Sequence, residues 1–279
     1  MRHLRTQLFL TLLLLWQAHC FADGPSTLEL TKAEFKVFDG LLFVNKPDLS
    51  PYGIKPIKIA YQAQLWKDGQ DISKMPDLLR IKNAVNQLDI KNSILVIDVE
   101  HWLVTEPNGE YNPENLAKQL QLLATFRKLS PSTQFGNYGI PYPDYWRASN
   151  SKGPEQAAQW RIENDRMQAI VDQQDIVMPS LYTFYADRDG WVKYAIAQMA
   201  EARRLAKGKP VYVFLWPQYH ESNPLLGNDY IHPDYWKMEL ETVKKYADGI
   251  VIWGGWQQTW DDEAEWWKAT KEFMNTIKQ

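Results

Sequence analysis

The chain has little of what several structural classes require. Its 279 residues include one cysteine, Cys20, so no disulfide can form within the chain. After residue 22 no apolar run is long enough to cross a bilayer, which predicts a soluble mature protein without a membrane partner. The formal net charge is only −3, and no basic cluster suits a nucleic acid. We therefore expect a protein that is stabilised by its apolar core.

Motifs for several chemistries are also missing. His101, His220 and His232 have no spacing typical of metal ligands, so no metal is expected. The sequence contains neither the G-x-S-x-G motif of serine hydrolases nor a glycine-rich phosphate loop. These absences predict a protein without a cofactor.

The first 22 residues have the form of a secretory signal. Arg2 and Arg5 precede an apolar core at residues 8–16, and the segment ends in Cys20-Phe21-Ala22. We expect cleavage after Ala22 and a secreted or periplasmic protein with a single domain at residues 23–279. A lipoprotein acylated at Cys20 is the alternative, although residues 17–19 match its usual pattern poorly.

Short apolar runs alternate with helical patterns along the rest of the chain. Seven runs predict parallel strands, at residues 41–44, 58–62, 93–100, 133–139, 176–182, 210–216 and 249–254. Helical periodicity follows at residues 76–88, 113–129, 154–173, 189–206, 233–246 and 261–277. This order predicts an α/β fold, an irregular (β/α) TIM-like barrel of seven strands with no helix in its first crossover. Such barrels keep their active sites at the C-terminal ends of the strands.

Two carboxylates follow the third apolar run. Alternation along a strand places Asp98, Glu100 and Trp102 on one face, and Val99 and His101 on the other. Neighbouring like charges disfavour double ionisation, which raises one pKa and suits a general acid. Such a pair can also cap a helix or lie in a solvated loop.

Polar and aromatic residues gather at the other predicted strand ends. They are Asn45, Tyr61, Tyr138, Tyr182, Trp216, Trp253 and Trp256. Tyrosine and tryptophan rings around two acids suit a pyranose, because the rings stack on the sugar and the hydroxyls fix its substituents. Core packing is the alternative for each ring taken singly.

Several motifs, in order along the chain, resemble the hyaluronidase family of glycoside hydrolases (glycoside hydrolase family 56). Residues 96–102 are similar to the family's catalytic strand V-I-D-x-E-x-W, and residues 135–141 to its W-G-x-Y-x-x-P segment. Further matches lie at residues 163–167 (E-N-D-x-M), 175–182 (D-x-x-x-P-S-x-Y) and 247–254 (A-D-G-x-x-I-W-G), with a weaker N-x-P at Asn45 and Pro47.

The resemblance implies retaining, substrate-assisted hydrolysis of a 2-acetamido-sugar glycan such as hyaluronan. Glu100 would be the general acid and base, and Asp98 would stabilise the acetamido group. Tyr182 would hydrogen-bond the same group, with Tyr138 beside it and Trp253 as a wall. Asn45, Tyr61 and Trp216 would complete the binding site for an oligosaccharide or polysaccharide.

The chain also departs from the family pattern. It has no disulfides and a short segment at residues 102–133, which predicts a shortened, bacterial-type relative with a lower cleft rim. Tyr61 precedes Gln62-Ala63-Gln64 where the family has Y-D-P-G. Two alternatives stay open. One is a hydrolase of another acetamido glycan (chitin oligosaccharide, peptidoglycan or chondroitin-like), and the other is a non-catalytic glycan-binding protein.

Overall fold

The computed structural model describes residues 34–142 and 154–277, so the predicted signal segment and Cys20 lie outside it. The strands are β1 (Lys36–Leu41), β2 (Ile54–Pro56), β3 (Lys58–Tyr61), β4 (Ile94–Asp98), β5 (Gln134–Asn137), β6 (Tyr212–Leu215) and β7 (Gly249–Gly254). The helices are α1 (Gln62–Leu65), α2 (Leu78–Leu88), α3 (Pro113–Leu129), α4 (Pro154–Asp165), α5 (Gln168–Gln173), α6 (Arg188–Ala206), α7 (Pro233–Tyr246) and α8 (Glu265–Ile277), with a 3-10 turn η1 (Ser50–Tyr52). No helix within the described ranges has the length and apolar character of a membrane span.

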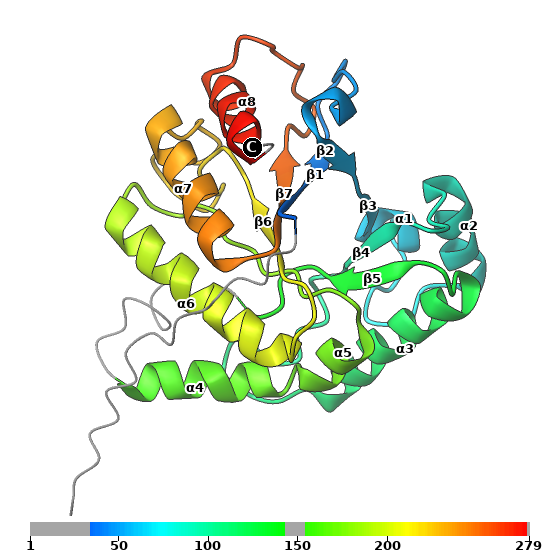
Figure 1. Ribbon diagram of the computed structural model, residues 1–279. Helices are drawn as coiled ribbons and strands as arrows, with labels where there is room; N and C mark the ends of the chain where they lie inside the picture. Colours follow the sequence, from blue (N-terminus) through cyan, green and yellow to red (C-terminus); the bar gives the residue numbers. More distant parts are fainter. Residues whose placement is uncertain (1–33, 143–153, 278–279) are drawn as a thin grey trace, which may run out of the picture.

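The strands form a ring of seven parallel segments. Two sheets, β2-β1-β7-β6 and β3-β4-β5, make up most of it. The extended stretch 54–61 joins them on one side, because β2 pairs with β1 and β3 pairs with β4. Residues 176–183 join them on the other side through parallel bridges to Tyr138, Val211, Phe214 and Tyr219. The helices lie outside this ring (Figure 1). The predicted TIM-like barrel is confirmed.

Alternation along the strands separates the barrel interior from the layer under the helices. On β4, Val96 belongs to the interior cluster, whereas Leu95 and Ile97 pack toward α2 and α3. On β6, Phe214 faces the interior, and Val213 packs in the outer cluster. A side chain two residues after Val96 therefore points into the mouth of the barrel, and that residue is Asp98.

Local sequence sets the helix starts. Pro113 and Pro233 stand at the first helical turns, where the missing proline N–H leaves no hydrogen bond unmade. The Asn112 side chain accepts a hydrogen bond from the Asn115 N–H, and the Asp187 side chain accepts one from the Gly190 N–H. Helix α3 therefore begins at Pro113 and α7 at Pro233, as the sequence predicts.

Most predicted elements differ from the structure only at their ends, as for the helix predicted at 261–277, which begins at Glu265, but three differ more. The first strand is Lys36–Leu41 rather than 41–44. The prediction missed it because Asp39 interrupts its apolar pattern; the Asp39 carboxylate binds the Lys46 amine 2.5 Å away. Residues 176–182 form isolated bridges, since Pro179 has no N–H for a continuous ladder. The single helix predicted at 154–173 is broken into α4 and α5 by a turn at Arg166 and Met167.

Close packing at the start of β7 gives a first prediction. A Cβ atom on Gly249 would collide with the Lys36 carbonyl oxygen and lie 3.1 Å from the Tyr212 ring. Gly249→Ala should lower the free energy of unfolding by about 1–3 kcal/mol, because β1 and β7 cannot separate without breaking their ladder. Urea denaturation measures this change. The control is Gly69→Asn, at an open position whose φ of 75° suits asparagine; equal losses in both variants would contradict the argument.

Candidate active site

The two predicted acids stand at the mouth of the barrel. Asp98 is the last residue of β4 and pairs in register with Tyr61 of β3, while Glu100 follows in the loop. Both line a cavity of about 360 Å³ at the C-terminal ends of the strands. That volume is within the range of small-molecule sites, roughly 300–1,000 Å³. The other lining residues are Ile59, Val96, Tyr138, Tyr182, Phe214, Trp216, His220, Glu221 and Trp253.

Burial perturbs both carboxyl groups. It raises the pKa of Asp98 to about 7, and the negative charge of Glu100 adds to the shift. The pKa of Glu100 is also raised, first by burial and then by the charge of Glu221. Asp98 Oδ1 is buried and has no hydrogen-bond partner among the described residues. The site therefore offers an unused acceptor beside a second, solvent-accessible acid.

Four aromatic side chains enclose the acids. Tyr182 stacks on Trp253 with ring centroids 5.7 Å apart, and Trp216 meets both rings edge to face at 5.5 and 5.1 Å. Tyr138 lies 6.1 Å from Tyr182 and donates a hydrogen bond of 3.1 Å to Ser180 Oγ. Burial raises the pKa of both tyrosines above the ordinary range, so both hydroxyls stay protonated as possible donors. This cage can stack on a sugar ring and hydrogen-bond its substituents.

The remaining predicted binding residues lie in different places. Tyr61 accepts a hydrogen bond of 3.0 Å from Trp253 Nε1 and so supports the cage from behind. Burial raises its pKa to about 12. Asn45 is exposed and is not among the residues that line the cavities at this end of the barrel. Trp256 is 64% exposed and does not line them either.

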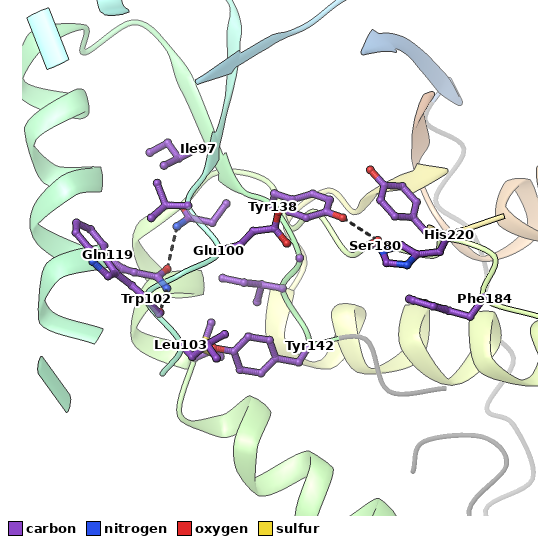
Figure 2. A pocket seen from close by; sticks show the side chains of 16 residues that line it. Ile97, Glu100, Trp102, Leu103, Gln119, Tyr138, Tyr142, Ser180, Phe184 and His220 are labelled. Carbon is purple, nitrogen blue, oxygen red and sulfur yellow. Dashed lines mark hydrogen bonds between the residues drawn. The ribbon is translucent and has the colours of Figure 1, made fainter. Parts of the chain in front are cut away.

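An adjoining cavity of about 250 Å³ adds residues that the sequence argument did not assign (Figure 2). Asn137, Ser180, Phe184 and His220 line it together with Glu100. Asn137 Oδ1 is buried without a partner among the described residues. Asn137 precedes Tyr138 and Ser180 lies two residues before Tyr182, within the motifs described above. This proximity to two predicted binding residues was the sequence feature that could have identified them. His220 and Glu221 lie in an irregular loop, where no periodic pattern marks them.

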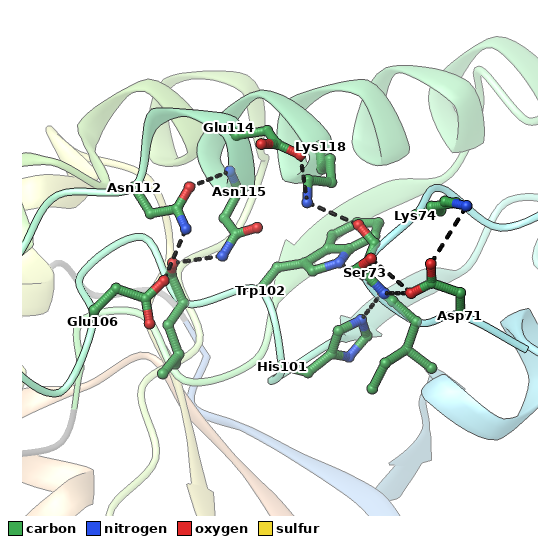
Figure 3. Close-up of polar contacts among 12 residues, drawn as sticks. Asp71, Ser73, Lys74, His101, Trp102, Glu106, Asn112, Glu114, Asn115 and Lys118 are labelled. Atoms are coloured by element: carbon green, nitrogen blue, oxygen red, sulfur yellow. Dashed lines mark hydrogen bonds and ion pairs between the residues drawn. The ribbon is translucent and has the colours of Figure 1, made fainter. Parts of the chain in front are cut away.

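The loop after Glu100 is held by polar contacts to its backbone (Figure 3). Gln119 and Asn115 of α3 donate hydrogen bonds to the carbonyls of Trp102 and Leu103, at 2.8 and 3.0 Å. The predicted shared face of Trp102 and the acids is wrong, because β4 ends at Asp98. The Trp102 ring packs against Trp66 with centroids 5.2 Å apart and donates to the Ile72 carbonyl. Glu100 therefore projects from a fixed loop rather than from a strand.

His101 also contacts the Ile72 carbonyl to which Trp102 donates. Its ring nitrogens lie 2.7 Å from Gln62 Oε1 and 2.7 Å from the Ile72 carbonyl oxygen. Burial lowers its pKa. Within residues 34–142 and 154–277, no three histidine, cysteine, aspartate or glutamate side chains are grouped so as to hold a metal ion. The side chains that line the two cavities at the barrel mouth include carboxyl, hydroxyl, amide and imidazole groups.

The shifted pKa of Asp98 predicts a pH-dependent stability. Its folded value of about 7 exceeds the unfolded value of about 3.9, so the folded state binds more protons between these pH values. Stability should therefore fall as pH rises from about 4 to about 7. Asp98→Asn should remove part of this loss and stabilise the protein at pH 8 by about 1–3 kcal/mol, measured by urea denaturation.

The control for this prediction is Glu241→Gln, at an exposed position on α7. It should leave the pH dependence unchanged. An equal decline in stability for wild type and Asp98→Asn between pH 4 and 8 would contradict the raised pKa.

Comparisons with known proteins identify related sequences. No family model matches the chain. Hyaluronidase from Polybia paulista is 30% identical over 195 residues, which cover 66% of this chain and 66% of that protein. Hyaluronidase from Polistes annularis is 28% identical over 195 residues, covering 66% of this chain and 52% of that protein. The chain thus spans about half the length of the latter relative.

Solved structures give the same relationship at the level of the fold. Two crystal structures of bee venom hyaluronidase, one in complex with a hyaluronic acid tetramer, match with a TM-score of 0.57 and 17% identity. They cover 88% of this chain and 100% and 97% of theirs. With that identity the match supports the barrel fold alone. Taken with the sequence matches, the chain resembles the hyaluronidase family.

Proposed function

We propose that the protein is an exported, retaining glycoside hydrolase that cleaves a 2-acetamido-sugar glycan, with residues 23–279 as one catalytic domain. One observation carries the proposal: two acids with raised pKa values project into an aromatic cavity at the C-terminal mouth of a barrel. The resemblance to hyaluronidases supports the choice of a glycosidic bond.

Glu100 acts as the general acid in this proposal. It is the more accessible of the two acids, and burial followed by the charge of Glu221 raises its pKa, which is the direction that a general acid requires. It gives that proton to the glycosidic oxygen as the bond to the anomeric carbon breaks. It then takes a proton from the water that completes hydrolysis.

The substrate supplies its own nucleophile. Its acetamido carbonyl oxygen attacks the anomeric carbon and forms an oxazolinium ring, which water later opens with overall retention of configuration. Asp98 ends β4 and Glu100 follows two residues later in the loop, so both acids enter the cavity from one side and do not flank a sugar from opposite faces as an enzymic acid and nucleophile would. Asp98 Oδ1, buried and unpartnered among the described residues, accepts the acetamido N–H and stabilises the positive charge that develops there.

The aromatic cage binds the sugar in this scheme. Tyr182 donates to the acetamido oxygen, with Tyr138 beside it, and Trp253 forms the wall against the ring. Trp216 closes the same wall and Tyr61 fixes Trp253. A glycan-binding protein without turnover would use the same cage, and it is distinguished by binding without product release.

Removing the general acid tests the proposal. Glu100→Gln should lower kcat by about 10²- to 10⁴-fold with substrate binding retained, because the amide keeps the shape and loses the proton. The measurement is reducing-end release by the purified protein on hyaluronan, chondroitin and chitin oligosaccharides. Near-normal turnover in this variant would exclude Glu100 from the role, and no release by the wild type from any substrate would favour the binding protein.

Removing the Tyr182 hydroxyl should have a milder effect. Tyr182→Phe keeps the ring that stacks on Trp253 and deletes only the hydroxyl donor, so kcat should fall by about 10- to 100-fold. Tyr212→Phe, also inside the barrel but outside the lining of the cavities at its C-terminal mouth, is the matched control. Equal activity of Tyr182→Phe and wild type would argue against a contact between this hydroxyl and the substrate.

A further inference from the structure

We propose that Glu221 makes the site select an uncharged acetamido-sugar polymer, of the chitin-oligosaccharide class, over a polymer that carries uronate carboxylates. This inference rests on the proposed function and names its substrate class. Glu221 acts here as a specificity-determining residue at the mouth of the cavity and takes no part in bond cleavage.

The cavities at the barrel mouth are lined by acidic groups without basic ones from the described residues. Three carboxyl groups, those of Asp98, Glu100 and Glu221, line the cavity of about 360 Å³, and Glu100 also lines the adjoining cavity of about 250 Å³. No lysine or arginine from the described residues lines either of them. Glu221 is exposed at the mouth, yet its charge reaches Glu100 strongly enough to raise the pKa of that acid. An anionic ligand in this space would meet negative charge without a cationic partner.

His220 does not offset these acids near neutral pH. Its ring lies 4.7 Å from the Phe184 ring and 6.3 Å from the Tyr182 ring, and burial among these aromatics lowers its pKa. The charge of Glu221 acts in the opposite direction but is the smaller cause, so the surroundings favour the neutral imidazole over the imidazolium.

Two basic side chains, that of Lys46 after β1 and that of Arg166 between α4 and α5, are already engaged. The Lys46 amine binds both carboxylate oxygens of Asp39, at 2.5 and 2.7 Å, and the Leu41 carbonyl. The Arg166 guanidinium donates to Thr105 Oγ1 and to the Gly109 carbonyl, at 3.1 and 3.0 Å. Neither is available to balance a uronate without giving up these contacts.

The loop that carries Glu221 is fixed in position. The His220 N–H donates to the Thr183 carbonyl at 2.8 Å, and Asn223 Nδ2 donates to the Phe184 carbonyl at 2.7 Å. Thr183 is held in turn by its hydroxyl bond of 2.6 Å to Glu239 of α7. Glu221 lies between two anchored residues, so its charge stays at the mouth of the cavity when a substrate enters.

The experiment compares two substrates that differ in charge. The probes are chitin oligosaccharides and hyaluronan oligosaccharides of equal length, and the quantity is the ratio of their kcat/KM values at low salt. The wild-type protein should favour the neutral oligosaccharide. Glu221→Gln should shift the ratio toward hyaluronan by about 3- to 10-fold, since one repulsive charge is lost at short range in a partly solvated site. Glu221→Lys should shift it further.

Two controls accompany the ratio. Glu241→Gln removes an exposed charge on α7, distant in sequence and outside the cavity lining, and should leave the ratio unchanged. Raising the salt to about 1 M, where the Debye length is about 3 Å, should shrink the difference between wild type and Glu221→Gln. The ratio cancels any common change in kcat that arises through Glu100.

The outcomes separate this inference from the proposed function. Turnover of both substrates with hyaluronan preferred by the wild type, or a ratio that Glu221→Gln leaves unchanged, overturns the charge selection and leaves the hydrolase intact. If the wild-type protein turns over neither substrate faster than Glu100→Gln does, the proposed function is contradicted, and the inference with it.

Discussion

The burial of the Asp98 carboxyl group at the end of β4 is the constraint on which the site depends. The barrel interior beneath it is filled by Val96, Phe214 and other apolar side chains, so a carboxylate at the next layer is taken out of water. Its pKa rises to about 7, and its Oδ1 atom stays without a partner among the described residues. A group in this state gains from a ligand that donates to it, which makes the empty acceptor a binding determinant.

The surrounding structure keeps Asp98 in that state. Tyr182, Trp216 and Trp253 contact one another and form the wall of the cavity, and Tyr61 fixes Trp253 by a hydrogen bond. The neighbouring backbone is fixed by α3, whose amide side chains bind the loop carbonyls. The same fixed loop places Glu100 within electrostatic reach of Asp98 and Glu221. The acid pair thus belongs to a rigid framework, as a preorganised site requires.

Periodic features of the sequence predicted the fold well, and irregular ones limited the prediction of the site. The apolar runs predicted six of the seven barrel segments, but the first strand was missed because Asp39, a half-buried and ion-paired carboxylate, breaks its apolar pattern. Strand alternation predicted the direction of Asp98 and failed for Trp102 beyond the strand end. The like charge was expected to shift the acid pKa, whereas burial is the larger cause, and burial depends on side chains from distant strands. His220 and Glu221 could not be placed at all, since loop positions follow tertiary contacts.

Titration of Asp98 itself tests the buried acid site most directly. Carboxyl carbon NMR with labelled aspartate, assigned through Asp98→Asn, would follow this group between pH 3 and 9 in wild type and in Glu100→Gln. We expect an apparent pKa of about 7 in the wild type, because the carboxyl is buried, and a lower value in Glu100→Gln, because the neighbouring charge is gone. An Asp98 pKa near 4 in the wild type would contradict the account, since the carboxylate would then be solvated and the buried acceptor would not exist.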